Sequence, residues 1–153
     1  MNKVISRNGW AFTVEIDGED LVVNGTTGTW FGGGNDSGDD GETSSGVMND
    51  GRDPNLLGCA LPVEWFSHST YDSPFIPTPH AQRRIPSIPW HTPVVVTHGT
   101  AQITVALIDN GPAKSVRRGI DLTAPAFRAL GGNLESGVMM VSYRIPGAAG
   151  YLS

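Results

Sequence analysis

The sequence predicts a single, mainly β domain with one short helix. Its 153 residues suit one hydrophobic core. Gly at 20 residues and Pro at 11 are frequent for this length, and both residue types favour turns over helices. Short segments alternate apolar and polar residues, which is the period of a half-buried strand. A hydrophobic share of 39% with 16% charged residues indicates a globular chain.

The first third is predicted to hold a hairpin, a strand and a long loop. Apolar and polar residues alternate over residues 10–23, with a turn at Asp17-Gly18. A second short strand is expected at 27–31. Residues 32–53 are rich in Gly, Asp, Ser and Asn and predict a loop. A loop this long in a compact domain favours a functional role.

The middle of the chain is predicted to be irregular. Residues 56–66 are apolar enough to be partly buried, and Cys59, the single cysteine, is expected there as a small buried hydrophobe. Prolines recur through 67–89 and exclude a helix or a central strand. We therefore expect this segment to be a long proline-rich loop over the surface.

The last third is more regular. Strands are expected at 93–97 and 101–108 about a turn at Gly99-Thr100, and a final strand at 138–145. Between them Thr123 is predicted to cap a helix.

That helix is expected to end at Gly131-Gly132. Its predicted inner face consists of Phe127, Ala129 and Leu130.

Composition excludes several classes of function. A formal net charge of −5 without a basic stripe argues against nucleic acid as a partner. No apolar run approaches the about 20 residues of a membrane span, and residues 1–10 lack the apolar run of a signal peptide. The four histidines and the single cysteine form no metal-binding pattern, so we expect neither a metal nor a cofactor.

The stretch from Ile88 to Val141 resembles rare lipoprotein A in the order and spacing of its motifs. The family carries Leu-Pro-x-Gly-Thr, Asp-Arg-Gly-Pro, Arg-Ile-Ile-Asp-Leu-Ser and Ala-Leu-Gly. The corresponding segments here are Ile88-Pro89-Trp90-His91-Thr92, Ile108-Asp109-Asn110-Gly111-Pro112, Arg118-Gly119-Ile120-Asp121-Leu122-Thr123 and Ala129-Leu130-Gly131.

A weaker match lies upstream. Thr29-Trp30-Phe31-Gly32-Gly33 is similar to the Thr-x-Tyr-Gly-Gly opening of expansins, and Thr43-Ser44-Ser45-Gly46 to the Thr-Ala-Asn-Gly of rare lipoprotein A. The resemblance implies a six-stranded double-psi β-barrel over 27–145, with residues 1–24 as an added N-terminal hairpin and 67–89 as an insertion. It also implies that a cell-wall polysaccharide lies across one face of the barrel.

Two carboxylates are the candidate catalytic residues. Cleavage of a glycosidic bond needs a carboxylic acid that protonates the leaving oxygen. By the resemblance Asp121 is that acid and Asp109 its partner. Each has a local alternative: Asp121 precedes a helix and can satisfy its first amides, and Asp109 can fix a turn.

Substrate contacts are expected from four further residues. Arg118 and Lys114 can pair with the carboxylates of a peptidoglycan stem, or form an exposed basic loop. Trp30 can stack on a sugar ring, or belong to the core. Asp36 lies in an acidic cluster that can add a carboxylate or hold Ca²⁺, which favours oxygen ligands, or that can simply be solvated.

The sequence departs from rare lipoprotein A at polar positions. Val47 replaces a glutamate, Asn110 replaces an arginine, and a histidine before the Leu-Pro pair is missing. The first hypothesis is a peptidoglycan-cleaving enzyme of the lytic transglycosylase type that works in an extracellular or periplasmic space. The alternatives are a non-catalytic glycan-binding or wall-loosening module, and a structural barrel with an assembly partner in a phage tail or secretion device.

Overall fold

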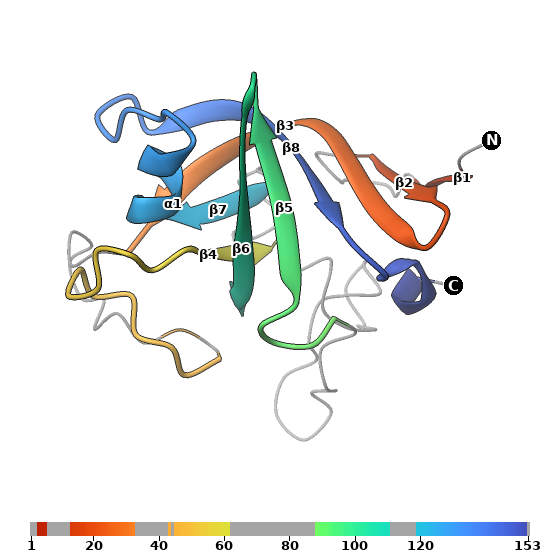
Figure 1. The fold of residues 1–153 in the computed structure, drawn as a ribbon, viewed down its shortest axis with the longest axis horizontal. Helices are drawn as coiled ribbons and strands as arrows, with labels where there is room; N and C mark the ends of the chain where they lie inside the picture. The colour runs from red at the N-terminus through yellow and green to blue at the C-terminus, as the bar shows by residue number, and fades with distance from the viewer. Residues whose placement is uncertain are drawn as a thin grey trace, which may run out of the picture.

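The protein is a mainly β structure whose strands form one continuous sheet (Figure 1). The computed structural model describes residues 3–5, 13–32, 43, 45–61, 88–110 and 119–152. Its strands are β1 (Lys3–Ile5), β2 (Val14–Asp17), β3 (Asp20–Phe31), β4 (Gly58–Leu61), β5 (Pro93–His98), β6 (Ala101–Asn110), β7 (Ile120–Thr123) and β8 (Val138–Ile145). A helix, α1 (Ala124–Ala129), follows β7, and a 3₁₀ helix (Ala149–Leu152) ends the chain.

Six of these strands close into a barrel. Their order is β3-β7-β4-β6-β5-β8, and β8 pairs with β3 to complete the circle. β3 and β7 are parallel, as are β4 and β6, whereas β4 and β7 between them are antiparallel. When β3, β4 and β5 are exchanged for β6, β7 and β8, respectively, the same circular order results, read in the opposite direction. The predicted six-stranded double-psi β-barrel is thus confirmed, with two halves related by a pseudo-two-fold axis between β4 and β7.

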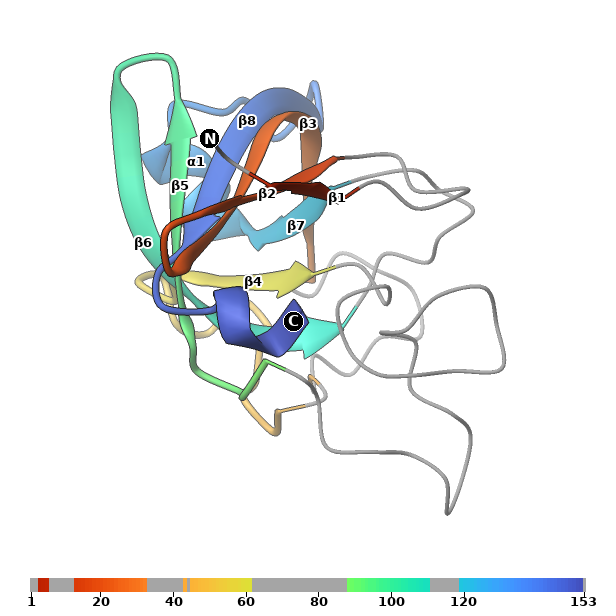
Figure 2. The ribbon, with the colours of Figure 1, turned by 90° about the vertical axis from the view of Figure 1, so that its right-hand side faces the viewer.

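The hairpin predicted at residues 10–23 is formed by β2 and β3. Asp17 lies opposite Asp20 across the two-residue turn Gly18-Glu19. β1 adds one more antiparallel strand at the outer edge of β2, a pairing that the sequence did not reveal. Figure 2 shows this extension projecting from the arch formed by β3 and β8.

The expectation of a separate strand at 27–31 was wrong, because β3 runs without a break from Asp20 to Phe31. Asn24-Gly25 resembles a turn in the sequence, but it forms a β-bulge where the register against β8 shifts between Val23 and Thr26. Gly25 has a φ of 65°, which a glycine adopts without a steric cost. β3 can therefore serve both the hairpin and the barrel.

The strands predicted in the last third are confirmed as β5, β6 and β8. Their alternating side chains fill the barrel, with Val94, Val105 and Val141 among the buried residues of the core. Ile88, at the end of the proline-rich segment, is also fully buried in that core. Residues 67–87 of the proline-rich segment lie outside the described residues.

The predicted helix begins where expected, with Thr123 at the N-cap position and Pro125 in the first turn. The Thr123 hydroxyl does not cap it. It donates to the Leu56 carbonyl (2.6 Å) and accepts from the Gly58 amide (3.2 Å), which fixes the entry to β4. Phe127 and Leu130 are buried as predicted, and Ala126 is buried with them, whereas Ala129, also predicted for the inner face, is exposed.

His91 has a φ of 71°, the one non-glycine residue with a positive φ among the residues described. It occupies the place where the Leu-Pro-x-Gly-Thr motif has glycine. Its amide donates to the Leu107 carbonyl (2.7 Å) and holds the segment before β5 against β6. A left-handed backbone explains why glycine suits this position.

Candidate functional site

Asp121 and Asp109 lie in one lateral row across the barrel wall. On β3 and β7, Thr29 is opposite Asp121; on β7 and β4, Asp121 is opposite Ala60; on β4 and β6, Ala60 is opposite Asp109. Laterally opposed residues of a sheet point to the same face. The row Thr29–Asp121–Ala60–Asp109 is called here the carboxylate row.

The carboxylate row faces outward. Ile120 and Leu122, on either side of Asp121, both belong to the core cluster, so the intervening Asp121 points to the outer face. Cys59 and Leu61 likewise belong to the core on either side of Ala60. The small side chain of Ala60 therefore separates the two carboxylates. Their backbones are two strand spacings apart, about 9–10 Å.

Asp121 is held by a hydrogen bond from the strand beside it. The Thr29 hydroxyl donates to Oδ1 of Asp121, and both residues are buried, with exposed fractions of 4% and 9%. Asp109 is half-buried. The two carboxylates thus differ in environment although they share one face.

A loop segment borders the carboxylate row at both ends. The Ser45 amide donates to the carbonyl of Ile108, immediately before Asp109 (3.0 Å). The Asn49 amide group donates to the carbonyl of Phe31, two residues after Thr29 (3.0 Å). Ser45 and Asn49 both belong to the loop predicted at 32–53, so its described part from 45 to 49 lies beside the row. Val47, at the place of the family's glutamate, is half-buried here.

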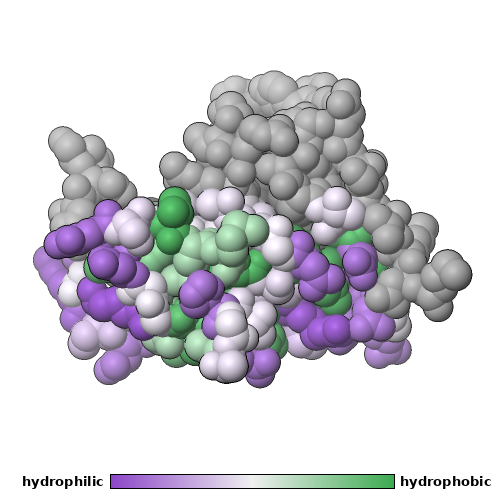
Figure 3. All heavy atoms as spheres, turned by 90° about the horizontal axis from the view of Figure 1, so that it is seen from above, coloured by the Kyte–Doolittle hydropathy of each residue, from purple (hydrophilic) through white to green (hydrophobic). Residues whose placement is uncertain are grey.

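Apolar side chains extend the row along β3 and β8. Val138 pairs with Thr29 and Met140 with Thr27, and their exposed fractions are 56% and 58%. Seen from above, the described surface has a hydrophobic area in its middle between hydrophilic ones (Figure 3). Val138 and Met140 belong to the same outer face as Asp121. The sequence alone did not identify Val138 and Met140 as surface residues, because strand alternation does not tell which face of a barrel is exposed to solvent.

Trp30 points to the other side of β3. It packs against the core, and its indole N–H donates to the Leu134 carbonyl (3.0 Å). Its neighbour Phe31 pairs with Thr123 on the outer face and is half-buried. The sequence correctly assigned the two aromatics to opposite faces, and Phe31 rather than Trp30 lies on the face of the carboxylate row.

The remaining predicted contacts, Arg118, Lys114 and Asp36, lie outside the described residues. Cys59 is fully buried as expected, and burial raises the pKa of its thiol. Over the part of the chain that is described, no three His, Cys, Asp or Glu side chains gather into a metal site, and no helix is long and apolar enough to cross a membrane.

No protein-family model matches this sequence, and no curated protein matches it. Solved structures do match. The Streptomyces papain inhibitor has a TM-score of 0.53 at 21% identity, covering 81% of this chain and 94% of the inhibitor. The apo expansin of Clavibacter michiganensis has a TM-score of 0.48 at 17% identity, covering 78% of this chain and 48% of the expansin, so the match spans about half of the expansin's length. The likeness to the inhibitor shows a shared fold.

Proposed function

We propose that the outer face around the carboxylate row binds a cell-wall polysaccharide of the peptidoglycan class. The observation that carries the proposal is the placement of Asp121 on β7 and Asp109 on β6 in one row, on one face, on either side of β4. The likeness of folds does not enter, because one fold serves many functions.

The row offers a polysaccharide two kinds of contact. Carboxylates accept hydrogen bonds from sugar hydroxyls, and bonds to a charged acceptor are about twice as strong as those between neutral groups. Phe31, Val138 and Met140 offer apolar surface to the C–H faces of sugar rings. A chain of linked sugars that crosses the strands meets both kinds of surface in turn.

The Thr29 hydroxyl fixes the orientation of Asp121 before a ligand arrives. A side chain that is already ordered loses less conformational entropy on binding. Asp121 is therefore the contact with the largest expected effect, and Asp109, which is more exposed, the smaller one. Arg118 and Lys114 remain proposed contacts for stem carboxylates.

Cleavage of the glycan is the second candidate function. It is favoured by the presence of two carboxylates in one row, since an inverting glycosidase uses one carboxyl group as acid and a second as base. In that reaction Asp121 protonates the leaving oxygen as the glycosidic bond breaks, and Asp109 takes a proton from the water that attacks the anomeric carbon. In a lytic transglycosylase the muramic 6-hydroxyl attacks that carbon instead of water, and Asp121 first gives its proton to the leaving oxygen and then takes the proton of the hydroxyl.

Sedimentation with insoluble peptidoglycan tests the binding proposal. Asp121→Asn keeps the shape of the side chain and removes its charge, and we expect it to weaken binding about tenfold or more, as expected for a charged hydrogen bond. Asp109→Asn is expected to weaken it less. Glu19→Gln is the matched control, because it makes the same charge change on the exposed hairpin turn. Equal binding by wild type, Asp121→Asn and Glu19→Gln would overturn the proposal.

Mass spectrometry of the soluble products separates binding from cleavage. Anhydromuropeptides or reducing-end products from the wild type, absent with Asp121→Asn, would establish cleavage; binding without products leaves a wall-binding module. A papain assay is the companion control, since the inhibitor with the same fold is named for that protease. Papain inhibition that survives Asp121→Asn, without glycan binding, would assign the barrel to protein recognition.

A further inference from the structure

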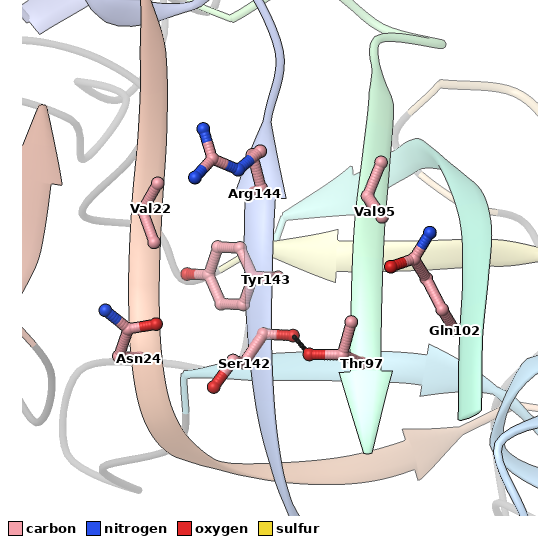
Figure 4. Close-up of a pocket in the computed structure, with 8 residues that line it drawn as sticks. All are labelled: Val22, Asn24, Val95, Thr97, Gln102, Ser142, Tyr143 and Arg144. Atoms are coloured by element: carbon pink, nitrogen blue, oxygen red, sulfur yellow. Dashed lines mark hydrogen bonds between the residues drawn. The ribbon is translucent and has the colours of Figure 1, made fainter. Parts of the chain in front are cut away.

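A hollow lies on the outer face of the barrel, away from the carboxylate row. It has a volume of about 310 Å³ and is lined by side chains of β3, β8, β5 and β6 (Figure 4). On β3 it lies at Val22 and at Asn24, which is part of the bulge, whereas Thr29 lies beyond the bulge. On β8 it lies at Ser142 and Arg144, beyond Met140. The two surfaces therefore share strands but not residues.

Valine side chains supply the apolar part of this hollow. The register places Val22 opposite Arg144 and Arg144 opposite Val95, so these three side chains form one row on the outer face. Val22 is buried and Val95 half-buried even though neither belongs to the core cluster. They form the aliphatic floor of the hollow on either side of the Arg144 side chain (Figure 4).

Hydroxyl and amide groups form the polar part. Thr97 lies opposite both Ser142 and Gln102, and its hydroxyl donates to the Ser142 carbonyl (3.4 Å). The Ser142 hydroxyl accepts from the Gly25 amide (3.0 Å). The amides of Asn24 and Gln102, both exposed, lie at opposite edges of the hollow (Figure 4). Each amide presents a donor beside an acceptor, which matches two neighbouring hydroxyls of one sugar ring.

The charge of the hollow disfavours an anion. Arg144 donates to Asp20 (2.7 Å) and to Asp17 (2.8 Å), so its one positive charge faces two carboxylates. These bonds raise the pKa of Arg144 and hold its guanidinium toward the β2–β3 turn. A ligand carboxylate or phosphate would meet a local net negative charge, whereas a neutral ligand avoids that repulsion.

We propose that this hollow is a second binding site, for a neutral saccharide, built from the aliphatic floor of Val22 and Val95 and the polar groups of Asn24, Thr97 and Gln102. Its volume is at the lower end of the about 300–1,000 Å³ typical of small-ligand sites. The proposal does not rest on the carboxylate row, because no residue is shared. Affinity for a single sugar is expected in the millimolar range, since the hollow is open.

Titrations followed by ¹H–¹⁵N NMR test the site with methyl β-glucoside and with glucuronate, which adds one negative charge to the same ring. We expect the glucoside to shift the backbone amides of Val22, Val95, Gln102 and Ser142 in a saturable way. Glucuronate is expected to bind more weakly. Gln102→Ala removes an exposed amide and is expected to weaken glucoside binding about three- to tenfold, the effect of one hydrogen bond.

One variant serves as the control. Thr104→Ala changes an exposed residue two positions along the same face of β6 but outside the hollow, and it is expected to leave the glucoside affinity unchanged. Three outcomes would each overturn the proposal: no saturable shifts at these amides, shifts confined to the carboxylate row, or tighter binding of glucuronate than of the glucoside. Failure of the peptidoglycan sedimentation test would leave this result untouched.

Discussion

The two halves of the barrel, β3 to β5 and β6 to β8, share a backbone arrangement but differ in their outward side chains. Gly58-Cys59-Ala60-Leu61 on β4 and Gly119-Ile120-Asp121-Leu122 at β7 occupy equivalent places about the pseudo-two-fold axis. In both, the glycine approaches a neighbouring strand, and the second and fourth residues enter the core. Only the third residue differs in kind, with Ala60 in one half and Asp121 in the other.

The flanking strands differ in the same way. Thr29 on β3 and Asp109 on β6 are equivalent about the axis, and each lies opposite the third residue of the neighbouring segment. The first half therefore contributes a hydroxyl and a methyl group to the carboxylate row, and the second half both carboxylates. Symmetry fixes the frame, and the asymmetry of a few outward side chains determines what the face can bind.

The equivalent glycines give the largest expected difference in stability. A Cβ at Gly119 would lie 2.6 Å from the Cβ of Thr26, whereas one at Gly58 would lie 2.6 Å from Cδ1 of Ile108, the flexible end of its side chain. We expect Gly119→Ala to lower the free energy of unfolding by about 3 kcal/mol and Gly58→Ala by about 1 kcal/mol. Urea unfolding measures both, and equal losses would show that the two approaches are equally tight.

The flanking residues give an intermediate effect. Thr29→Val keeps the shape of a buried side chain and removes the hydroxyl that donates to Asp121, so we expect a loss of about 2 kcal/mol. Asp109→Asn at the equivalent, half-buried place is expected to cost less. The same unfolding measurement compares them. A larger loss for Asp109→Asn would mean that the second half anchors the row and the first does not.

The smallest expected effect concerns the hairpin extension, which belongs to the first half alone. The amide of Gly147 and the guanidinium of Arg144 lower the pKa of Asp20. A carboxyl whose pKa is lower in the folded state stabilises fully above its unfolded pKa of about 3.9, and this contribution is lost as the pH falls through the folded value. Asp20→Asn is therefore expected to make the free energy of unfolding slightly less sensitive to acid below about pH 4, as urea unfolding at several pH values would show. An unchanged pH dependence would contradict the role given to the bonds from Gly147 and Arg144 to Asp20.

Local patterns were sufficient for the regular parts of the fold. Alternation and turn residues predicted the β2–β3 and β5–β6 hairpins, because these pairings join neighbours in sequence. Alternation also predicted the final strand, but not its distant partners β3 and β5. The expected break between residues 23 and 27 was wrong, since a bulge lets one strand continue through Asn24-Gly25. Ala129 was assigned to the wrong face of the helix, because it is exposed while Phe127 and Leu130 are buried as predicted.

The site could be predicted only in part. The motifs pointed to Asp121 and Asp109, but the row depends on the lateral register of four strands, and register between distant segments is not visible in local periodicity. Thr29 belongs to the expansin-like motif Thr29-Trp30-Phe31-Gly32-Gly33. Its hydrogen bond to Asp121 joins residues 92 positions apart, so no local pattern could predict it. Phe31, Val138 and Met140 could not be assigned to the outer face before the closure of the barrel was known.

The most direct test of the account is to map where a soluble glycan binds. Chitotetraose, titrated into ¹⁵N-labelled protein, is expected to shift the backbone amides of Thr29, Phe31, Asp121 and Val138, and Asp121→Asn is expected to abolish those shifts while its spectrum stays folded. Binding that maps elsewhere, or that Asp121→Asn leaves intact, would contradict the claim that the two carboxylates of the second half determine the function of this face.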